Sequence, residues 1–251
     1  MFSLQAFAST TNIGTTLTNM TPVSDPTLAI SGNFAFIPTL NQLIGVYGLG
    51  ANLLRVQLST PSLLANVPLD VTPIDTNNLP ANPSPLLMFA DAPIPLVVDE
   101  PLQVLATATQ SGASDGEVFV FTADGPQAPV TGQIIRCRAT TTTIGTKDAW
   151  LNSALSLTNQ LAEGNYQLVG ARIEGSHVKA ARFVFPGSSN STRPGMIASQ
   201  FKYSVRDDDP FRSGRMGVWG TFSNRVLPTV DTLCDGTGET ATLILDLIKT
   251  Q

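Results

Sequence analysis

Three consecutive carboxylates, Asp207 to Asp209, are the residues of this sequence best suited to binding a metal ion. Carboxylate oxygens are ligands that Ca²⁺ prefers. Successive side chains of an extended chain point in opposite directions, so at most two of the three can converge on one ion. The cations that flank this run and can neutralise it are Arg206, Arg212 and Arg215. We therefore expect a solvated loop or an inter-subunit patch of salt bridges here, rather than a calcium site.

The chain contains one histidine, His177, within a predicted strand. A Ser-His-Asp triad would have to use this residue as its base. A polar strand residue that faces water or an interface is the simpler interpretation. Two distant cysteines, Cys137 and Cys234, lack the spacing of zinc ligands and are expected to be buried free thiols. The Gly-rich stretch Asp235–Glu239 is neither a phosphate-binding loop nor an EF-hand loop, so we predict no catalytic residues, no metal and no cofactor.

The segment from Arg172 to Arg225 is the most basic part of the chain, and it also contains most of the aromatic residues of the second half. Arginine and aromatic side chains can stack on bases, but the same mixture is typical of protein–protein interfaces. Four acidic residues within the segment favour the second interpretation. We therefore predict a subunit interface that includes Arg182, Arg206, Asp207, Asp208, Asp209, Phe211, Arg212, Arg215 and Trp219.

Charged residues are scarce, at 13% of the 251 residues, which is about half the usual share. Hydrophobic residues make up 42%, enough for a sizeable core. The surface must consequently be covered by Thr, Ser, Asn, Gln, Gly and Pro. Such a surface costs less to desolvate than one of Lys and Glu, so it suits burial against neighbouring subunits.

The charge is distributed unevenly along the chain. Residues 1–135 hold one basic residue, Arg55, and nine acidic ones, which gives 1 − 9 = −8. Residues 136–251 hold thirteen basic and ten acidic residues, which gives 13 − 10 = +3. This asymmetry fits either two faces of one solvated domain or a head-to-tail contact between subunits, in which an acidic patch meets a basic one.

The first residues are polar and rich in Thr, without the basic region of a secretory signal. No run of 18 apolar residues occurs in the sequence, so we expect no transmembrane segment. A basic N-terminal arm, the usual electrostatic means of holding nucleic acid, is also missing. Direct binding of nucleic acid is therefore not expected.

Thr, Pro and Gly recur every 8–12 residues with short apolar runs between them, which is typical of a β-sandwich or barrel. Residues 117–123 are apolar on both faces and predict a strand buried on both sides. Residues 166–173 and 177–185, joined by a three-residue loop, predict a β-hairpin. Alternating leucines in 241–248 predict a strand that ties the end of the chain into a sheet.

One helix is predicted, over residues 147–162. Thr146 is a suitable N-cap, Asp148 complements the positive helix end, and apolar residues recur at spacings of three to four. Overall we predict an all-β, jelly-roll or β-sandwich protein with this short capping helix. Residues 1–27 would form an extended arm and 28–251 a single domain, in which the Pro-rich stretch 61–101 is an ordered connection.

In composition and strand rhythm the chain resembles viral, phage-type capsid and virion structural proteins. The resemblance implies a jelly-roll fold, self-assembly through subunit contacts, copies of itself and other virion proteins as partners, and location in the virion. The missing basic arm fits a shell around a separately condensed genome or an inner membrane, or an outer decoration, spike or penton subunit. A β-sandwich adhesin or glycan-binding module, with Trp150, Trp219 and Tyr203 as stacking faces, is the alternative. A glycoside hydrolase with paired carboxylates is the least supported reading.

Overall fold

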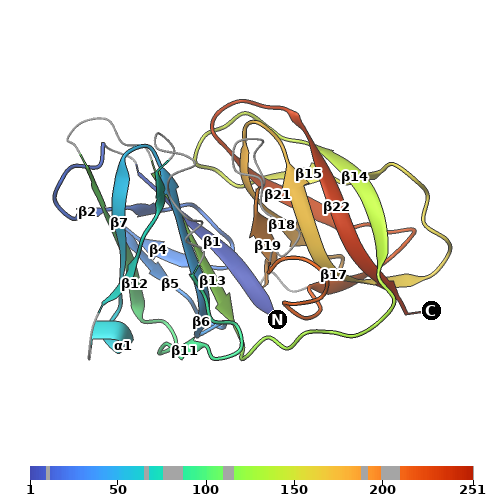
Figure 1. Ribbon diagram of the computed structural model, residues 1–251, viewed down its shortest axis with the longest axis horizontal. Helices are drawn as coiled ribbons and strands as arrows, with labels where there is room; N and C mark the ends of the chain where they lie inside the picture. The colour runs from blue at the N-terminus through green and yellow to red at the C-terminus, as the bar shows by residue number, and fades with distance from the viewer. Residues whose placement is uncertain are drawn as a thin grey trace. The chain divides into compact units, whose positions relative to one another are not determined.

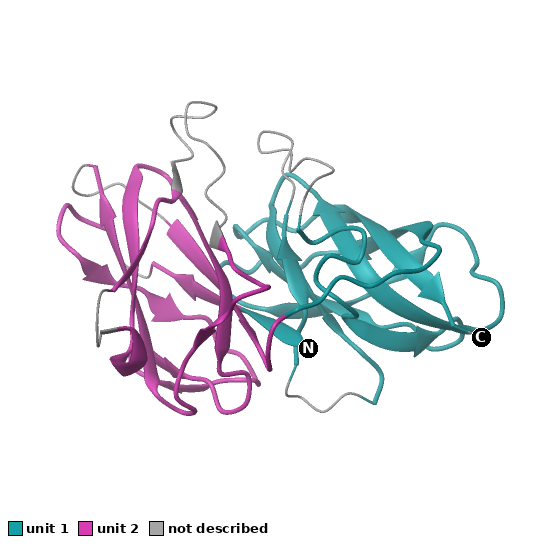
Figure 2. Ribbon diagram, turned by 60° about the horizontal axis from the view of Figure 1, so that its bottom comes forward, with its two compact units in different colours: residues 1–4, 127–251 teal, residues 5–126 magenta. Residues whose placement is uncertain are grey.

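The computed structural model describes residues 1–9, 12–64, 68–75, 87–109, 116–187, 192–198 and 210–250. Almost all of its regular structure is antiparallel β-sheet, and the helix in these ranges is the four-residue α1, Pro61–Leu64 (Figure 1). The predicted all-β class is therefore confirmed. The chain folds into two compact units, whereas one domain was predicted (Figure 2). We call residues 5–126 the N-terminal jelly roll, and residues 1–4 with 127–251 the C-terminal jelly roll.

The N-terminal jelly roll consists of two sheets. The first has the order β10 (Leu87–Met88), β6 (Gln42–Gly50), β13 (Gly116–Ala123), β1 (Phe2–Ala8) and β3 (Thr21–Pro22), with β9 (Ile74–Asp75) and β11 (Ile94–Pro95) also paired to β6. The second has the order β4 (Ala29–Ser31), β5 (Phe34–Phe36), β12 (Pro101–Ala108), β7 (Leu53–Ser59) and β8 (Leu69–Val71), with β2 (Thr18–Asn19) paired to β12. The prolines of residues 61–101 predict edge segments, because proline cannot donate a hydrogen bond to a sheet. The described strands that lie between them, β8 to β11, are only two or three residues long.

The C-terminal jelly roll also consists of two sheets. One has the order β16 (Ser156–Leu157), β14 (Ile135–Thr142), β22 (Thr240–Lys249), β17 (Asn165–Glu174) and β20 (Gly220–Ser223). The other has the order β15 (Leu151–Ala154), β21 (Thr229–Cys234), β18 (Val178–Val184) and β19 (Gly195–Ile197).

The two units share one topology. Eight principal strands can be numbered along each unit: β1, β5, β6, β7, β8, β10, β12 and β13 in the first, and β14, β15, β17, β18, β19, β20, β21 and β22 in the second. In both units the sheets then have the orders 1-8-3-6 and 2-7-4-5. This is the arrangement of a double-sheet jelly roll. The chain thus carries the predicted fold twice.

Strand β13 forms the centre of its sheet, and all eight of its residues are buried, as the sequence predicted. Val118 and Val120 belong to the core cluster of the N-terminal jelly roll, where they pack with Val46. Phe119 and Phe121 occupy the opposite face of the same strand and are equally buried. Since residues alternate between faces along a strand, these valines and phenylalanines require cover on both faces of β13.

Residues 1–27 do not form the extended arm that was predicted. Strand β1 is buried along its whole length and pairs with β3.

The predicted hairpin of residues 166–173 and 177–185 is also wrong in its pairing. Its strands exist as β17 and β18, but each belongs to a different sheet. The loop at 174–176 therefore connects the two sheets of the sandwich.

The helix predicted over residues 147–162 is absent, and the segment forms β15 and β16 instead. Asp148 has a φ of 55°, a left-handed conformation that cannot begin a right-handed helix. Leu151 pairs with Thr232 on β21, and Ser156 pairs with Thr140 on β14. The segment also contains Asn, Ser and Thr, which are weak helix formers, so tertiary pairing outweighs the helical spacing of its apolar residues.

Candidate functional site

The residues of the predicted subunit interface occupy very different positions. Arg182, Phe211, Arg212 and Trp219 are at most 3% exposed, so they have almost no surface to offer to another subunit. Arg215 is exposed. Arg206 and Asp207 to Asp209 lie outside the described residues. Interface contact thus remains a prediction for Arg215 and the acidic run, while the four buried residues act inside their own unit.

Arg212 forms a buried ion pair with Asp246 on β22. Its Nε and Nη2 donate to Oδ2 and Oδ1 of Asp246 at 2.8 and 3.1 Å, and the Ser213 N–H donates to Oδ2 at 2.8 Å. The loop that carries Arg212 lies directly on β17, since a Cβ at Gly170 would come within 2.8 Å of the Phe211 carbonyl oxygen. Asp246 consequently holds this loop against the sheet.

Arg182 on β18 forms a second buried cluster. Its Nε donates to Oδ2 of Asp231 at 3.0 Å, and its Nη1 donates to the Leu4 carbonyl at 3.3 Å. The guanidinium carbon also lies 4.2 Å from the ring centroid of Trp150, a cation–π distance. Arg193 approaches the same carboxylate at 3.8 Å. Arg182 therefore links β18 to Asp231 of β21 and to Leu4, within the C-terminal jelly roll.

The aromatic residues proposed as glycan-stacking faces are largely occupied by the fold. Trp219 packs edge-on against Phe2 and Phe183, at centroid distances of 5.3 and 6.0 Å. Trp150 is half-buried and lies under the Arg182 guanidinium. Tyr203 lies outside the described residues. A stacking groove built on these three residues therefore has no support from Trp219 or Trp150.

His177 belongs to a polar cluster between two loops of the C-terminal jelly roll. Its Nδ1 lies 2.9 Å from Oδ2 of Asp235. Glu239 accepts backbone N–H groups from Ser176, His177 and Val178 at 2.7–2.9 Å. The cluster ties the 174–178 connection to the 235–239 turn. His177 and Asp235 are the residue types that serve as base and orienting acid in a catalytic triad. No nucleophile is hydrogen-bonded to this pair among the described residues.

The hydrogen bond that His177 makes to the Asp235 carboxylate raises the pKa of His177, and the negative charges of Asp235 and Glu239 add to this effect while partial burial opposes it. Burial acts to raise the pKa of Asp235, but hydrogen bonds from His177 and the Thr237 N–H, with the charges of His177 and Lys179, lower it overall. The pair is therefore most stabilising when His177 is protonated and Asp235 is ionised.

Replacing His177 by asparagine is expected to lower the melting temperature most at about pH 5. There the histidine is protonated and the carboxylate ionised, given unperturbed pKa values of about 6.5 and 3.9. A raised histidine pKa stabilises the fold below the unfolded-state value and loses this effect as the pH rises through the folded value. The difference between variant and unchanged protein should thus shrink towards about pH 8, and thermal unfolding across this range measures it. A difference independent of pH would contradict this role.

A Gly-x-Ser-x-Gly pattern does occur in the sequence, from Gly112 to Gly116, although none was expected beside His177. In hydrolases this pattern forms a turn from a strand into a helix. Here β12 precedes it and β13 follows it, so the flanking elements are both strands.

Among the described residues, no group of three or more His, Cys, Asp or Glu side chains could hold a metal ion. Both cysteines are free and buried, as predicted, and burial raises the pKa of each thiol.

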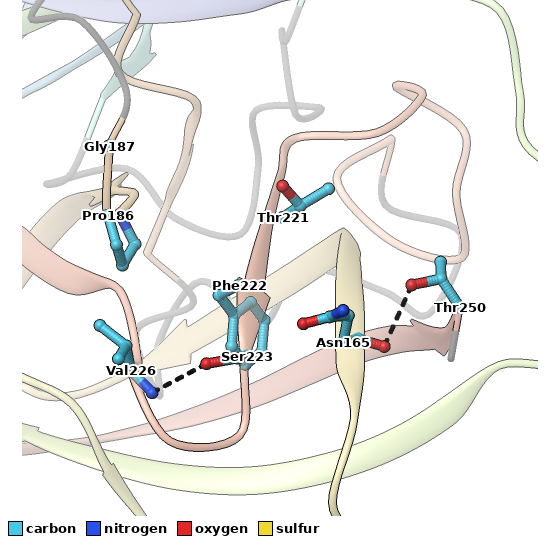
Figure 3. A pocket seen from close by; sticks show the side chains of 8 residues that line it. All are labelled: Asn165, Pro186, Gly187, Thr221, Phe222, Ser223, Val226 and Thr250. Atoms are coloured by element: carbon cyan, nitrogen blue, oxygen red, sulfur yellow. Dashed lines mark hydrogen bonds between the residues drawn. The ribbon is translucent and has the colours of Figure 1, made fainter.

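A pocket of about 710 Å³ is lined by residues of the C-terminal jelly roll, among them Asn165 at the start of β17 and Thr250 directly after β22 (Figure 3). None of the described residues that line it is charged: Asn165, Pro186, Gly187, Thr221, Phe222, Ser223, Val226 and Thr250. Several of its polar groups already bond to one another, as when the Thr250 hydroxyl donates to the Asn165 carbonyl at 3.2 Å. Phe222 is buried and stacked on Tyr166. The lining supplies no acid, base or ionic anchor.

The outward face of β14 carries positive charge. Along this strand Cys137 and Ala139 are buried, while Arg136 and Arg138 are exposed on the opposite face. Arg138 pairs in the ladder with Ile244 of β22, which is half-buried. We call Ile134, Arg136, Arg138 and Ile244 the β14 face.

The charge asymmetry of the sequence coincides with the division into two units. All nine acidic residues of the first half lie in residues 5–126, and all thirteen basic residues of the second half lie in residues 127–251. The single basic residue of the N-terminal jelly roll, Arg55, is bound to Asp70 by two hydrogen bonds of 2.9 and 2.7 Å. Each chain therefore carries an acidic and a basic jelly roll.

These features define a tandem jelly-roll protein whose buried charges stabilise the fold. The chain is similar in structure to the major capsid protein P2 from bacteriophage PM2, with 10% sequence identity, a TM-score of 0.26, and coverage of 100% of this chain and 98% of that one. No protein-family model matches the sequence, and no curated protein matches it. In the described part of the chain, no helix is long and apolar enough to cross a membrane.

Proposed function

We propose that this protein is a structural subunit that assembles with copies of itself, most simply as part of a viral capsid or virion shell. The observation that carries the proposal is the pairing of two jelly rolls of opposite net charge in one chain. Unlike surfaces on identical chains favour head-to-tail contacts, which close into rings when the rotation permits. Other virion proteins would be additional partners, and the virion the location.

The character of the surface supports the same function. Large apolar side chains are exposed on both jelly rolls, among them Leu54, Val97, Ile144 and Val226. Exposed apolar groups on a surface with few charges favour burial against other proteins. The arginine–aspartate pairs that a catalytic or ionic site could have used instead hold loops and strands in place. We therefore place the function on the surface, and we propose no enzymatic activity.

A glycan-binding module is the second candidate, and the uncharged pocket at Asn165 and Thr221 is the observation in its favour. Hydroxyl and amide groups are suitable partners for sugar hydroxyls, and jelly rolls also occur in lectin domains. The buried, stacked position of Phe222 weighs against it, because the ring has little face to offer a sugar.

Sedimentation velocity and negative-stain microscopy of the purified chain test the proposal. We expect concentration-dependent assembly into rings, closed oligomers or shells at about 0.1 M salt, and weaker assembly at about 1 M salt because charge contacts are then screened. A monomer that persists at high concentration and binds a glycan array would contradict assembly and favour the second candidate. Asn165→Ala, in the pocket, should abolish such glycan binding but leave assembly unchanged.

A further inference from the structure

We infer that the β14 face of one subunit binds the turn Val97–Asp99 on the N-terminal jelly roll of the next subunit. We call Val97, Val98 and Asp99 the valine tip. This inference rests on the proposed self-assembly and specifies which surfaces meet. It is carried by opposite charges that each unit leaves in local excess, and by apolar side chains beside those charges on both surfaces.

The β14 face holds more positive charge than its own unit neutralises. Arg136 is 62% exposed and lies 3.6 Å from Asp246. That carboxylate is already neutralised by the buried, bidentate Arg212. Among the described residues, no carboxylate forms an ion pair with Arg138. Two exposed arginines at positions i and i+2 of one strand thus leave a local excess of about two positive charges.

Apolar side chains flank these arginines. Ile134 lies two residues before Arg136, directly before the strand begins, and it is exposed. Ile244 lies beside Arg138 on the neighbouring strand. Arginine surrounded by aliphatic side chains is typical of the well-packed centre of protein interfaces. A polyanion alone would gain little from the isoleucines.

The valine tip has the complementary composition. Val97 and Val98 are 65% and 48% exposed, the first being the most exposed large apolar side chain among the described residues of the N-terminal jelly roll. Asp99 is exposed, and no basic residue of the described chain pairs with it. A carboxylate next to two uncovered valines matches arginines next to isoleucines in both charge and polarity.

The valine tip is also held in a fixed conformation. The Glu100 N–H donates to the Val97 carbonyl at 3.3 Å, and the Asp99 N–H donates to the Ile37 carbonyl at 3.2 Å. The Glu100 carboxylate accepts the Val97 N–H at 3.1 Å and the Ser62 hydroxyl at 2.8 Å. Asp99 takes up a φ of 58°, which Asp tolerates better than most residues. A preorganised projection loses little conformational entropy on binding.

A charge exchange tests the inference. The double variant Arg136→Glu, Arg138→Glu reverses the β14 face, and Val98→Lys, Asp99→Asn reverses the valine tip while keeping a residue that tolerates positive φ. Each pair alone should raise the dissociation constant of self-association about tenfold or more at about 0.1 M salt. Mixing the two proteins, or combining all four substitutions in one chain, should restore association. Sedimentation equilibrium measures each constant.

The matched controls are Asp91→Lys, an exposed carboxylate of the same jelly roll outside the tip, and Arg225→Glu, an exposed arginine outside the β14 face. Both should leave the dissociation constant within about threefold. Circular dichroism checks that every variant is folded.

Unchanged association of the reversed variants, or no recovery on mixing, overturns the inference while self-assembly stands. An unchanged chain that never associates overturns both. The last outcome concerns short duplex DNA. If the unchanged protein binds it, and only the Arg136→Glu, Arg138→Glu variant loses this binding while its self-association stays intact, the β14 face binds nucleic acid and the inference is overturned.

Discussion

Replacing Asp246 by alanine is expected to lower the free energy of unfolding of the C-terminal jelly roll by about 3–5 kcal/mol, because Arg212 would be left buried without its counter-charge. The Ser213 N–H would also lose its acceptor. Both tryptophans of the chain belong to this unit, so tryptophan fluorescence during urea unfolding reports on it specifically. The midpoint should fall well below that of the unchanged protein.

The control for this experiment is an exposed ion pair in the same unit. Glu163 and Arg225 pair while each is 76% exposed, and Glu163→Gln should cost less than about 1 kcal/mol. A hydrophobic exchange, Asp246→Leu with Arg212→Met, should recover part of the loss, because it removes both charges together. Equal, small effects of Asp246→Ala and Glu163→Gln would show that the buried pair does not stabilise the unit.

Replacing Trp219 by alanine is expected to cost about 3–5 kcal/mol of the same unfolding free energy, since it leaves a large cavity between Phe2 and Phe183. Trp219→Phe keeps a ring at the site and should cost less. The remaining tryptophan, Trp150, serves as the fluorescent reporter in both variants. If Trp219 instead served mainly to contact a partner, its removal would weaken association and leave the unfolding midpoint unchanged.

Local patterns in the sequence predicted the strands well. Residues 117–123 form a strand that is buried throughout, and residues 241–248 form a strand within a sheet, both as predicted. Pairing was harder to predict, because β17 and β18 follow one another closely yet join different sheets. The apolar residues of 147–162 recur at helical spacing, which predicted a helix. The segment instead pairs with β14 and β21, and a short stretch of sequence contains no information about such distant partners.

The second jelly roll could not be predicted, since the two units share topology without a repeat that stands out in the sequence. Buried arginines were also missed, and for a physical reason. Arg212 and Arg182 look like surface residues until their carboxylates are known, and these lie 34 and 49 residues away. Arginine is almost never fully buried without such a partner. By contrast, the charge asymmetry was visible in the sequence and coincides with the two units.

Residues 1–4 belong to the C-terminal unit, although residues 5–126 separate them from the rest of it in the sequence. Phe2 packs on Trp219, the Ser3 hydroxyl accepts the Arg193 N–H, and the Leu4 N–H donates to the Arg193 carbonyl. During synthesis these residues leave the ribosome long before their partners exist. They can make these contacts only after residues 193–219 have been synthesised. Completion of the C-terminal unit therefore depends on contacts of very long sequence separation, which makes its last folding step slow and its unfinished form prone to exchange strands with other chains.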